Sequence, residues 1–253
     1  MNNKKRYFIE LAYHGKYYHG WQVQPNAVSV QEVLNQKMST ILREEIYVIG
    51  SGRTDTGVHC KQQFAHFDTS SALHPSDFKH KLNSFLPTDI SIQKLTEVKP
   101  EAHARFDATF RRYEYHISLA KNPFATDLAW EVTKMPNFDT MNEAANLLLA
   151  FESFESFCKT HSQNDHFKCD ITQAYWEKTN NNTAIFHIKA NRFLRGMVRL
   201  IVGELMKVGT GKMSVAHFKE SLEARTSRSN RVSAPPQGLF LCEVGYPDDI
   251  FVQ

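Results

Sequence analysis

The chain of 253 residues is long enough for one large domain or two small ones, and its 42% hydrophobic and 23% charged residues are typical of a soluble globular protein. Its net charge of +3 is too small to indicate nucleic-acid binding by itself. No apolar run approaches the roughly 18 residues of a membrane span, and the N-terminus lacks the apolar region of a signal peptide. We therefore expect a cytoplasmic protein that does not enter a membrane. Its four cysteines lack C-x-x-C spacing, which predicts reduced thiols.

The first half of the chain predicts a β-α-β-β-α-β order of elements. Ser29 and Glu32 form a capping box before an apolar pattern with helical spacing, and Pro87 ends a second pattern of this kind. The expected elements are a strand at 7–13, a helix at 30–44, strands at 46–49 and 62–68, a helix at 76–86 and a strand at 89–98.

The second half shows similar alternation, with Thr140 and Glu143 as a second capping box and Gly209 as a helix stop. The expected elements are a strand at 110–118, a helix at 140–150, strands at 171–178 and 183–190, helices at 192–208 and 214–225, and a strand at 238–246. This order predicts the α+β class, with two similar halves built from mainly antiparallel strands.

The most informative segment is Gly50-Ser51-Gly52-Arg53-Thr54-Asp55-Thr56-Gly57-Val58-His59-Cys60. It places a carboxylate between glycines, which permit tight backbone geometry, and two residues from an arginine that favours its charged form. A tight turn with a capping Asp55 is the structural alternative. A phosphate-binding loop is excluded, because Val58-His59 occupies the place of the required Lys-Ser/Thr.

The C-terminal half carries a basic segment, residues 189–231, with ten Lys/Arg and three acidic residues. On the predicted helix at 192–208, Arg192, Arg195 and Arg199 form a stripe opposite a broad apolar face, with Gly196 and Gly203 beside it. This excess of positive charge predicts phosphate binding, and a solvated helix face is the alternative.

A metal site is a further possibility that the sequence raises. His59, His66, Asp68 and Asp55 lie close together in the chain, but their spacing matches no standard zinc signature. We therefore expect no metal, and we expect His59 to be structural.

Five motifs in this chain, in family order from about residue 7 to residue 246, resemble those of the TruA family of tRNA pseudouridine synthases. The motif of highest specificity is Gly-Arg-Thr-Asp-x-Gly-Val-His at 52–59. The others are His19-Gly20-Trp21-Gln22-Val23-Gln24-Pro25-Asn26, Ala104-Arg105-Phe106-Asp107-Ala108 with Arg111-Arg112-Tyr113-Glu114-Tyr115, Phe193-Leu194 with Met197-Val198-Arg199-Leu200-Ile201-Val202-Gly203, and Ala234-Pro235-Pro236-Gln237-Gly238-Leu239-Phe240-Leu241. Departures from the family pattern are Ser51, Cys60, Glu152-Ser153 and Asp170.

The resemblance implies an enzyme that isomerises uridine to pseudouridine at positions 38–40 in the anticodon stem-loop of tRNA. It implies no cofactor, and a homodimer in which tRNA spans both subunits. It also implies that the two halves, here 1–107 and 108–253, share one long sheet with the active cleft between them. An RNA-binding protein without catalysis and a metal-dependent nuclease are the rival functions.

By the same resemblance, Asp55 is the nucleophile and Arg199 is its partner. Tyr113 stacks on the target base, and Arg53 is associated with extrusion of the target nucleotide. Base flipping of this kind is the general device for chemistry on a stacked base. The expected RNA-binding residues are Tyr113, Arg53, Arg192, Arg195, Arg225 and Arg228.

Overall fold

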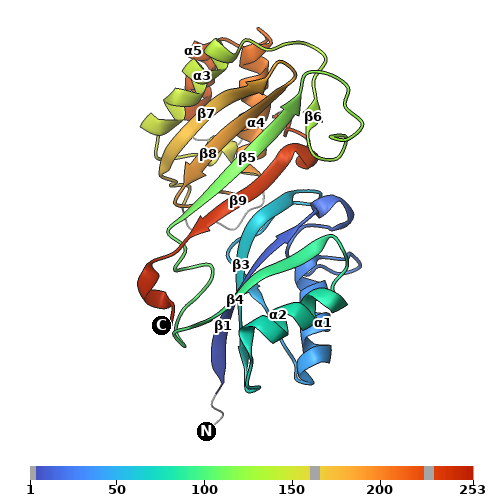
Figure 1. Cartoon of the computed structure of the whole chain (residues 1–253). Coiled ribbons are helices and arrows are strands. Elements are labelled where there is room, and N and C mark those ends of the chain that lie inside the picture. The colour runs from blue at the N-terminus through green and yellow to red at the C-terminus, as the bar shows by residue number, and fades with distance from the viewer. Residues whose placement is uncertain (1–3, 160–165, 225–230, 253) are drawn as a thin grey trace. The chain divides into compact units, whose positions relative to one another are not determined.

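A computed structural model of the chain describes residues 4–159, 166–224 and 231–252. These residues form five α-helices and nine strands, most of them antiparallel, which confirms the α+β class (Figure 1). The chain divides into two compact units, residues 1–109 with 241–253, and residues 110–240. The assignment of the last 13 residues to the first unit is a feature that the sequence did not indicate.

The first unit is built on the strand order β4-β1-β3, with the short β2 beside β3, and every pairing in it is antiparallel. Figure 1 shows both helices of this unit on the same side of the strands, and α2 contacts β4. The elements are β1 (Lys5–Tyr13), α1 (Val30–Leu42), β2 (Ile49–Gly50), β3 (His59–Thr69), α2 (Pro75–Phe85) and β4 (Ile90–Val98).

The helices of the first unit begin and end within two residues of the predicted positions. The Ser29 side chain caps α1 by accepting a hydrogen bond from the Glu32 backbone N–H at 3.3 Å. Val30, Leu34 and Met38 then repeat at helical spacing on one face, and all three are fully buried. Helix α2 ends at Phe85, two residues before Pro87, which cannot continue it.

Strand β1 is covered on both faces. Tyr7, Ile9, Leu11 and Tyr13 alternate on one face and are buried, as a half-buried strand requires. Phe8 points to the opposite face and is also buried, with an exposed fraction of 1%.

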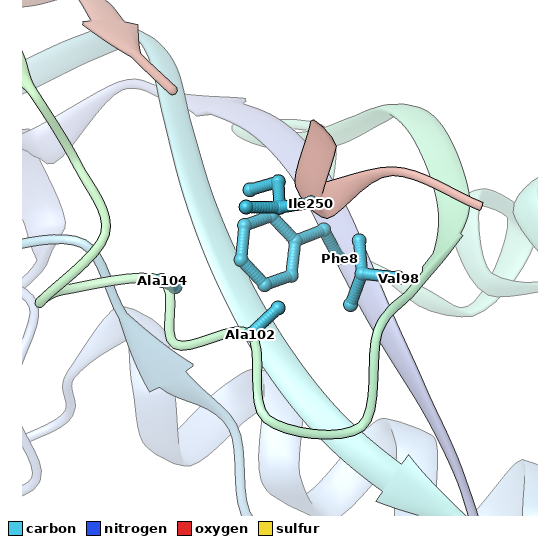
Figure 2. Close-up of a cluster of buried hydrophobic side chains, with 5 residues drawn as sticks. All are labelled: Phe8, Val98, Ala102, Ala104 and Ile250. Atoms are coloured by element: carbon cyan, nitrogen blue, oxygen red, sulfur yellow. The ribbon is translucent and has the colours of Figure 1, made fainter. Parts of the chain in front are cut away.

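The cover over Phe8 comes from two segments that follow strands. Its ring lies among Val98, Ala102, Ala104 and Ile250, as Figure 2 shows. Ile250 comes from the end of the chain, whose Asp248–Ile250 turn is anchored by the Lys99 N–H, which donates to the Ile250 carbonyl at 3.0 Å. The C-terminal residues therefore complete the core of the first unit.

The second unit is built on the order β5-β8-β7, again antiparallel, with β6 added parallel to β5. Its three helices lie on the same side of these strands (Figure 1), and α3 contacts α4, α5 and β7. The elements are β5 (Phe110–Ser118), β6 (Trp130–Glu131), α3 (Phe138–Leu147), β7 (Ile171–Asn180), β8 (Thr183–Ala190), α4 (Met197–Gly209), α5 (Val215–Glu223) and β9 (Leu239–Gly245), through which the chain passes from the second unit back to the first.

Three local predictions were wrong, each because a side chain or a distant backbone group takes a hydrogen bond. The predicted strand at 46–49 contributes only Ile49 to β2, since Ser39 and Asn35 of α1 accept from the backbone N–H groups of Ile46 and Val48. Helix α3 is capped by Asn137, three residues before Thr140, and its side chain accepts from two backbone N–H groups.

The third error concerns the predicted helix at 192–208, which begins only at Met197. Gly196 has a φ of +71°, and the Arg195 carbonyl accepts a hydrogen bond from the Lys159 N–H at 3.1 Å. Both features hold residues 192–196 outside the helix. Helix α4 ends at Gly209 as predicted and is buried on nearly every side. Within the described residues, no helix combines the length and apolar character needed to cross a membrane.

Candidate active site

The segment with Asp55 is a tight loop between β2 and β3. Gly57 has a φ of +77°, a left-handed conformation that favours glycine. The Val58 N–H donates to the Asp55 carbonyl at 3.2 Å and closes a turn around the carboxylate residue. Asp55 is half-buried, whereas Arg53 is exposed. The loop therefore presents a carboxylate at a partly desolvated surface, as a reactive group requires.

The segment of residues 13–21 fixes this loop through hydrogen bonds. The Tyr13 hydroxyl and the Thr54 hydroxyl are 2.9 Å apart in a buried hydrogen bond. The Thr54 carbonyl accepts from the Trp21 N–H at 3.3 Å, and the Gly57 N–H donates to the Tyr18 carbonyl at 3.3 Å. The backbone is thus fixed on both sides of Asp55, which limits the positions that its carboxylate can reach.

Two glycines in the supporting segment allow this close approach. Gly20 has a φ of +82°, and a Cβ there would overlap the Thr54 carbonyl oxygen. A Cβ on Gly15 would overlap the Val58 carbonyl oxygen. Inspection of the loop alone does not identify these two residues. The signal that could have found Gly20 is its place in the second motif, next to Trp21.

Replacement of Gly20 by alanine should damage the loop. Alanine at this position combines an unfavourable φ with an overlap against Thr54, so we expect a loss of about 2–4 kcal/mol in the free energy of unfolding. Urea titration of the wild type and Gly20→Ala measures it.

Gly52→Ala is the matched control, because a Cβ on Gly52 meets nothing within 4 Å. We expect its free energy of unfolding to stay within about 1 kcal/mol of the wild type. Equal losses in both variants would show that the Gly20 contact does not support the loop.

Arg199 is the third residue of α4, and it forms hydrogen bonds with the segment that precedes β9. Its Nε donates to the Ala234 carbonyl at 2.7 Å, and the Ala234 N–H donates to the Arg199 carbonyl at 2.9 Å. A Cβ on Gly203 would overlap the Val232 carbonyl oxygen. Because Gly203 has no side chain, residues 232–234 can pack closely against this part of α4.

Tyr113 lies on β5, opposite Ile188 of β8. It is half-buried, and the Phe193 ring packs edge-on against it, with centroids 5.2 Å apart and planes at 89°. Tyr115, two residues further along β5 and on the same face, is fully buried, and its hydroxyl donates to the Pro235 carbonyl at 2.8 Å. Burial raises the pKa of Tyr115 well above its ordinary value. Tyr115 is a structural residue, whereas Tyr113 is only half-buried.

The predicted stripe of three arginines on one helix face is wrong. Arg192 and Arg195 lie in the 191–196 loop before α4, and only Arg199 is helical. Arg192 contacts His166, with 2.9 Å between its Nη1 and the imidazole Nε2, and Arg195 is exposed. Arg225 and Arg228 lie outside the described residues.

Several charges of the basic segment have structural partners. Lys207 pairs with the buried Glu204 at 2.7 Å, and the Lys189 ammonium lies 3.6 Å from the centroid of the Phe110 ring. Arg231 donates to the carbonyls of Ser156 and Ser221 at 2.7 and 3.1 Å. The excess of positive charge in 189–231 therefore overstates the charge presented to a ligand.

Comparison with known proteins decides the family. The family model described as tRNA pseudouridine synthase matches residues 11–107 and 144–247. The chain belongs to this family of tRNA pseudouridine synthases. Curated relatives named tRNA pseudouridine synthase A come from Bacteroides thetaiotaomicron, 47% identical over 98% of this chain and 93% of the relative, and from Bacteroides fragilis, 46% identical over 98% of each. A more distant relative of the same name, from Picosynechococcus, is 37% identical over 99% of this chain and 92% of its own length.

In this pseudouridine synthase, the residues that raised the possibility of a metal site have other partners. His59 accepts the Gly15 N–H at Nδ1 (3.1 Å), and His66 accepts the Ala104 N–H in the same way (3.1 Å). Both Asp68 oxygens accept from Arg6, at 2.7 and 2.8 Å, which lowers the pKa of Asp68. Among the described residues, no group of three His, Cys, Asp or Glu is arranged to hold a metal ion.

His66 should make the stability of this synthase depend on pH. Burial lowers the pKa of His66 from 6.5 to about 4. Between these values the unfolded chain binds a proton that the folded chain does not, so stability is full above pH 6.5 and falls as the pH drops toward 4. The difference corresponds to about 3 kcal/mol. His66→Asn keeps an acceptor for the Ala104 N–H but does not titrate.

We expect urea titrations at pH 7.5, 6, 5 and 4.5 to show a shallower decline for His66→Asn than for the wild type. The comparison between the two proteins removes the contribution of other titrating groups. Parallel declines would contradict a buried neutral His66.

Two of the departures from the family pattern, Glu152-Ser153 and Asp170, lie in the second unit where the chain segments around them are joined by backbone hydrogen bonds. The Glu152 carbonyl accepts the Cys169 N–H at 2.8 Å, and Ser153 forms an isolated bridge with Lys168. The Asp170 N–H donates to the Asn191 side chain at 2.9 Å, and the Asp170 carbonyl accepts from the Asn191 N–H. The contacts at Glu152 and Asp170 use main-chain atoms, which any residue type can supply.

Proposed function

We propose that this protein isomerises uridine to pseudouridine in the anticodon stem-loop of tRNA, at positions 38–40, with Asp55 as the nucleophile. The observation that carries the proposal is the half-buried Asp55 in a loop fixed on both sides by residues 13–21. Membership of the tRNA pseudouridine synthase family supports it. We further propose that the protein acts in the cytoplasm as a homodimer on one tRNA.

The reaction breaks the N1–C1′ bond of uridine and forms a C5–C1′ bond to the same base. An ionised carboxylate such as Asp55 can form a covalent intermediate with the nucleotide, which divides one difficult step into two easier ones. If the carboxylate attacks C1′, the freed uracil turns, C5 attacks C1′ as the bond between C1′ and Asp55 breaks and releases the carboxylate, and the proton on C5 is transferred to N1 through a base or solvent. Atoms and electrons balance within the nucleotide, so the chemistry needs no cofactor.

In this proposal, three further side chains serve the step. Arg199 holds the Asp55 carboxylate in its charged form, and Tyr113 stacks on the uracil during its turn. Arg53, which is exposed on the same loop as Asp55, occupies the space of the flipped nucleotide in the stack. Asp55 and Arg53 belong to the first unit, whereas Tyr113 and Arg199 belong to the second. The proposal therefore requires the two units to share one sheet and to meet at a common cleft.

The direct test is mass mapping of pseudouridine in an unmodified tRNA transcript after incubation with the purified protein. We expect modification at uridines 38–40 that persists in the presence of a strong chelator. Loss of activity on chelation would instead favour a metal-dependent enzyme, and an absence of pseudouridine with intact RNA would favour a binding protein without catalysis.

Replacement of Tyr113 should separate the roles of its ring and its hydroxyl. If the ring stacks on the base, Tyr113→Phe keeps tRNA affinity and Tyr113→Leu loses about 1–3 kcal/mol of binding, measured as a Kd ratio. If the hydroxyl takes part in proton transfer, Tyr113→Phe binds normally but turns over slowly. Full activity in both variants would remove Tyr113 from the site.

A further inference from the structure

A short turn beside the Asp55 loop is fixed at both ends. The turn is the 3-10 helix Gly15–Tyr17, which contacts β3. At its start, the Gly15 N–H donates to His59 at 3.1 Å, and the Gly15 Cα lies against the Val58 carbonyl. At its end, the Tyr18 carbonyl accepts from the Gly57 N–H, and the Tyr18 hydroxyl donates to Asp89 at 2.6 Å. The backbone of the turn is thus part of the support of the Asp55 loop.

The two residues between these anchors face solvent. Gly15 and Tyr18 are buried, but Lys16 is exposed and Tyr17 has an exposed fraction of 69%. The Lys16 ammonium lies 5.3 Å from the centroid of the Tyr17 ring. A single exposed aromatic residue is ordinary in a folded protein. This one combines a rigid backbone, an adjacent cation and direct attachment to the loop that carries the nucleophile.

We propose that Lys16 and Tyr17 form a contact site for single-stranded RNA, in which Tyr17 stacks on an unpaired base beside the target uridine and Lys16 binds a phosphate. This inference rests on the proposed function, which brings a tRNA loop to Asp55. A flat aromatic ring accepts any base, and a lysine binds phosphate as a point charge. Because the turn is already ordered, the contact costs little further backbone entropy.

The experiment uses the full-length protein with two RNA probes, the isolated anticodon stem-loop and a fully paired RNA duplex of equal length. We expect Tyr17→Ala to weaken binding of the stem-loop about tenfold and to leave duplex binding nearly unchanged, because only the loop offers an unpaired base. Tyr17→Phe should restore stem-loop affinity. Lys16→Gln should reduce the slope of log affinity against log salt concentration by about one, the change expected for the loss of one phosphate contact.

Tyr47 provides a matched control. It lies in the first unit with an exposed fraction of 64%, but its hydroxyl donates to the Glu45 carboxylate, a charge that repels RNA. Tyr47→Ala should bind both probes like the wild type.

The inference would be overturned if Tyr17→Ala left the stem-loop Kd unchanged, or if Tyr17→Ala and Tyr47→Ala weakened stem-loop binding equally. It would also be overturned if light scattering showed that Tyr17→Ala changes the number of subunits, which would assign Tyr17 to a protein contact. Mass mapping of pseudouridine made by the wild type is a separate measurement that tests the proposed function alone. If the wild type makes none, the proposed function fails, whatever the Kd ratios show.

Discussion

Asp55→Asn should abolish pseudouridine formation and leave tRNA affinity within about threefold of the wild type. The amide has nearly the shape of the carboxylate but cannot act as a nucleophile. The hydrogen bonds that hold the loop include those of the Asp55 carbonyl, of its neighbours' backbone and of the Thr54 hydroxyl, and the substitution leaves these groups in place, so it should also preserve the fold. Single-turnover assays with excess enzyme, together with urea titration, measure the two effects.

Asp55→Glu is the matched control, because it retains the charge and displaces it by one methylene group. Misplacement of a reacting group by about 1 Å can cost about 100-fold in rate, so we expect a severe loss here as well. Intact-mass measurement of Asp55→Asn before and after the assay detects deamidation. Turnover by a sample that is still fully amidated would remove Asp55 from the nucleophile's role.

Arg199→Ala should reduce kcat by at least about 100-fold, the scale expected for loss of a preorganised charge partner. The structure adds a cost that the helix pattern did not suggest, because Arg199 Nε also binds the Ala234 carbonyl. Its loss should lower the free energy of unfolding by about 1–3 kcal/mol. Arg199→Lys should recover part of the rate but not the forked hydrogen bonding.

Arg231→Ala separates the two effects. Arg231 belongs to the same unit and also binds backbone carbonyls, those of Ser156 and Ser221, with its guanidinium over the Phe157 ring. We expect this variant to lose stability while its folded fraction keeps the wild-type kcat. If Arg199→Ala raises the Kd for tRNA by the same factor as it lowers the rate, then Arg199 acts on the RNA and not on Asp55.

Local patterns were sufficient for most of the fold. The capping side chain of Ser29 and the stops at Pro87 and Gly209 mark helix ends through interactions within a few residues, and the structure confirms them. Two of the three errors share a different cause. Residues 46–48 donate to side chains of α1, and the Arg195 carbonyl accepts from the Lys159 N–H, which are contacts with other segments that no local pattern reveals.

The site divides in the same way. The glycine pattern and the motif identify the Asp55 loop from sequence, because its geometry is local. Its support comes from residues more than 30 positions away: the motif at 19–26 marks Gly20, but the contacts of Tyr13 and Gly15 could be found only in the structure. The charge count of residues 189–231 likewise could not reveal that Lys207 and Arg231 serve the interior of the second unit.

The packing of Ile250 against Phe8 has a consequence for synthesis on the ribosome. Domains generally fold as units, N-terminal first, while the chain is made at about 5–20 residues per second. Here the part of the first unit's core around Phe8 stays incomplete until the segment with Tyr246, Ile250 and Phe251 has been made, after the whole of the second unit. The face of β1 that carries Phe8 therefore lacks part of its cover while the second unit is being made. A premature stop after residue 240 would consequently impair the half of the protein that was translated first.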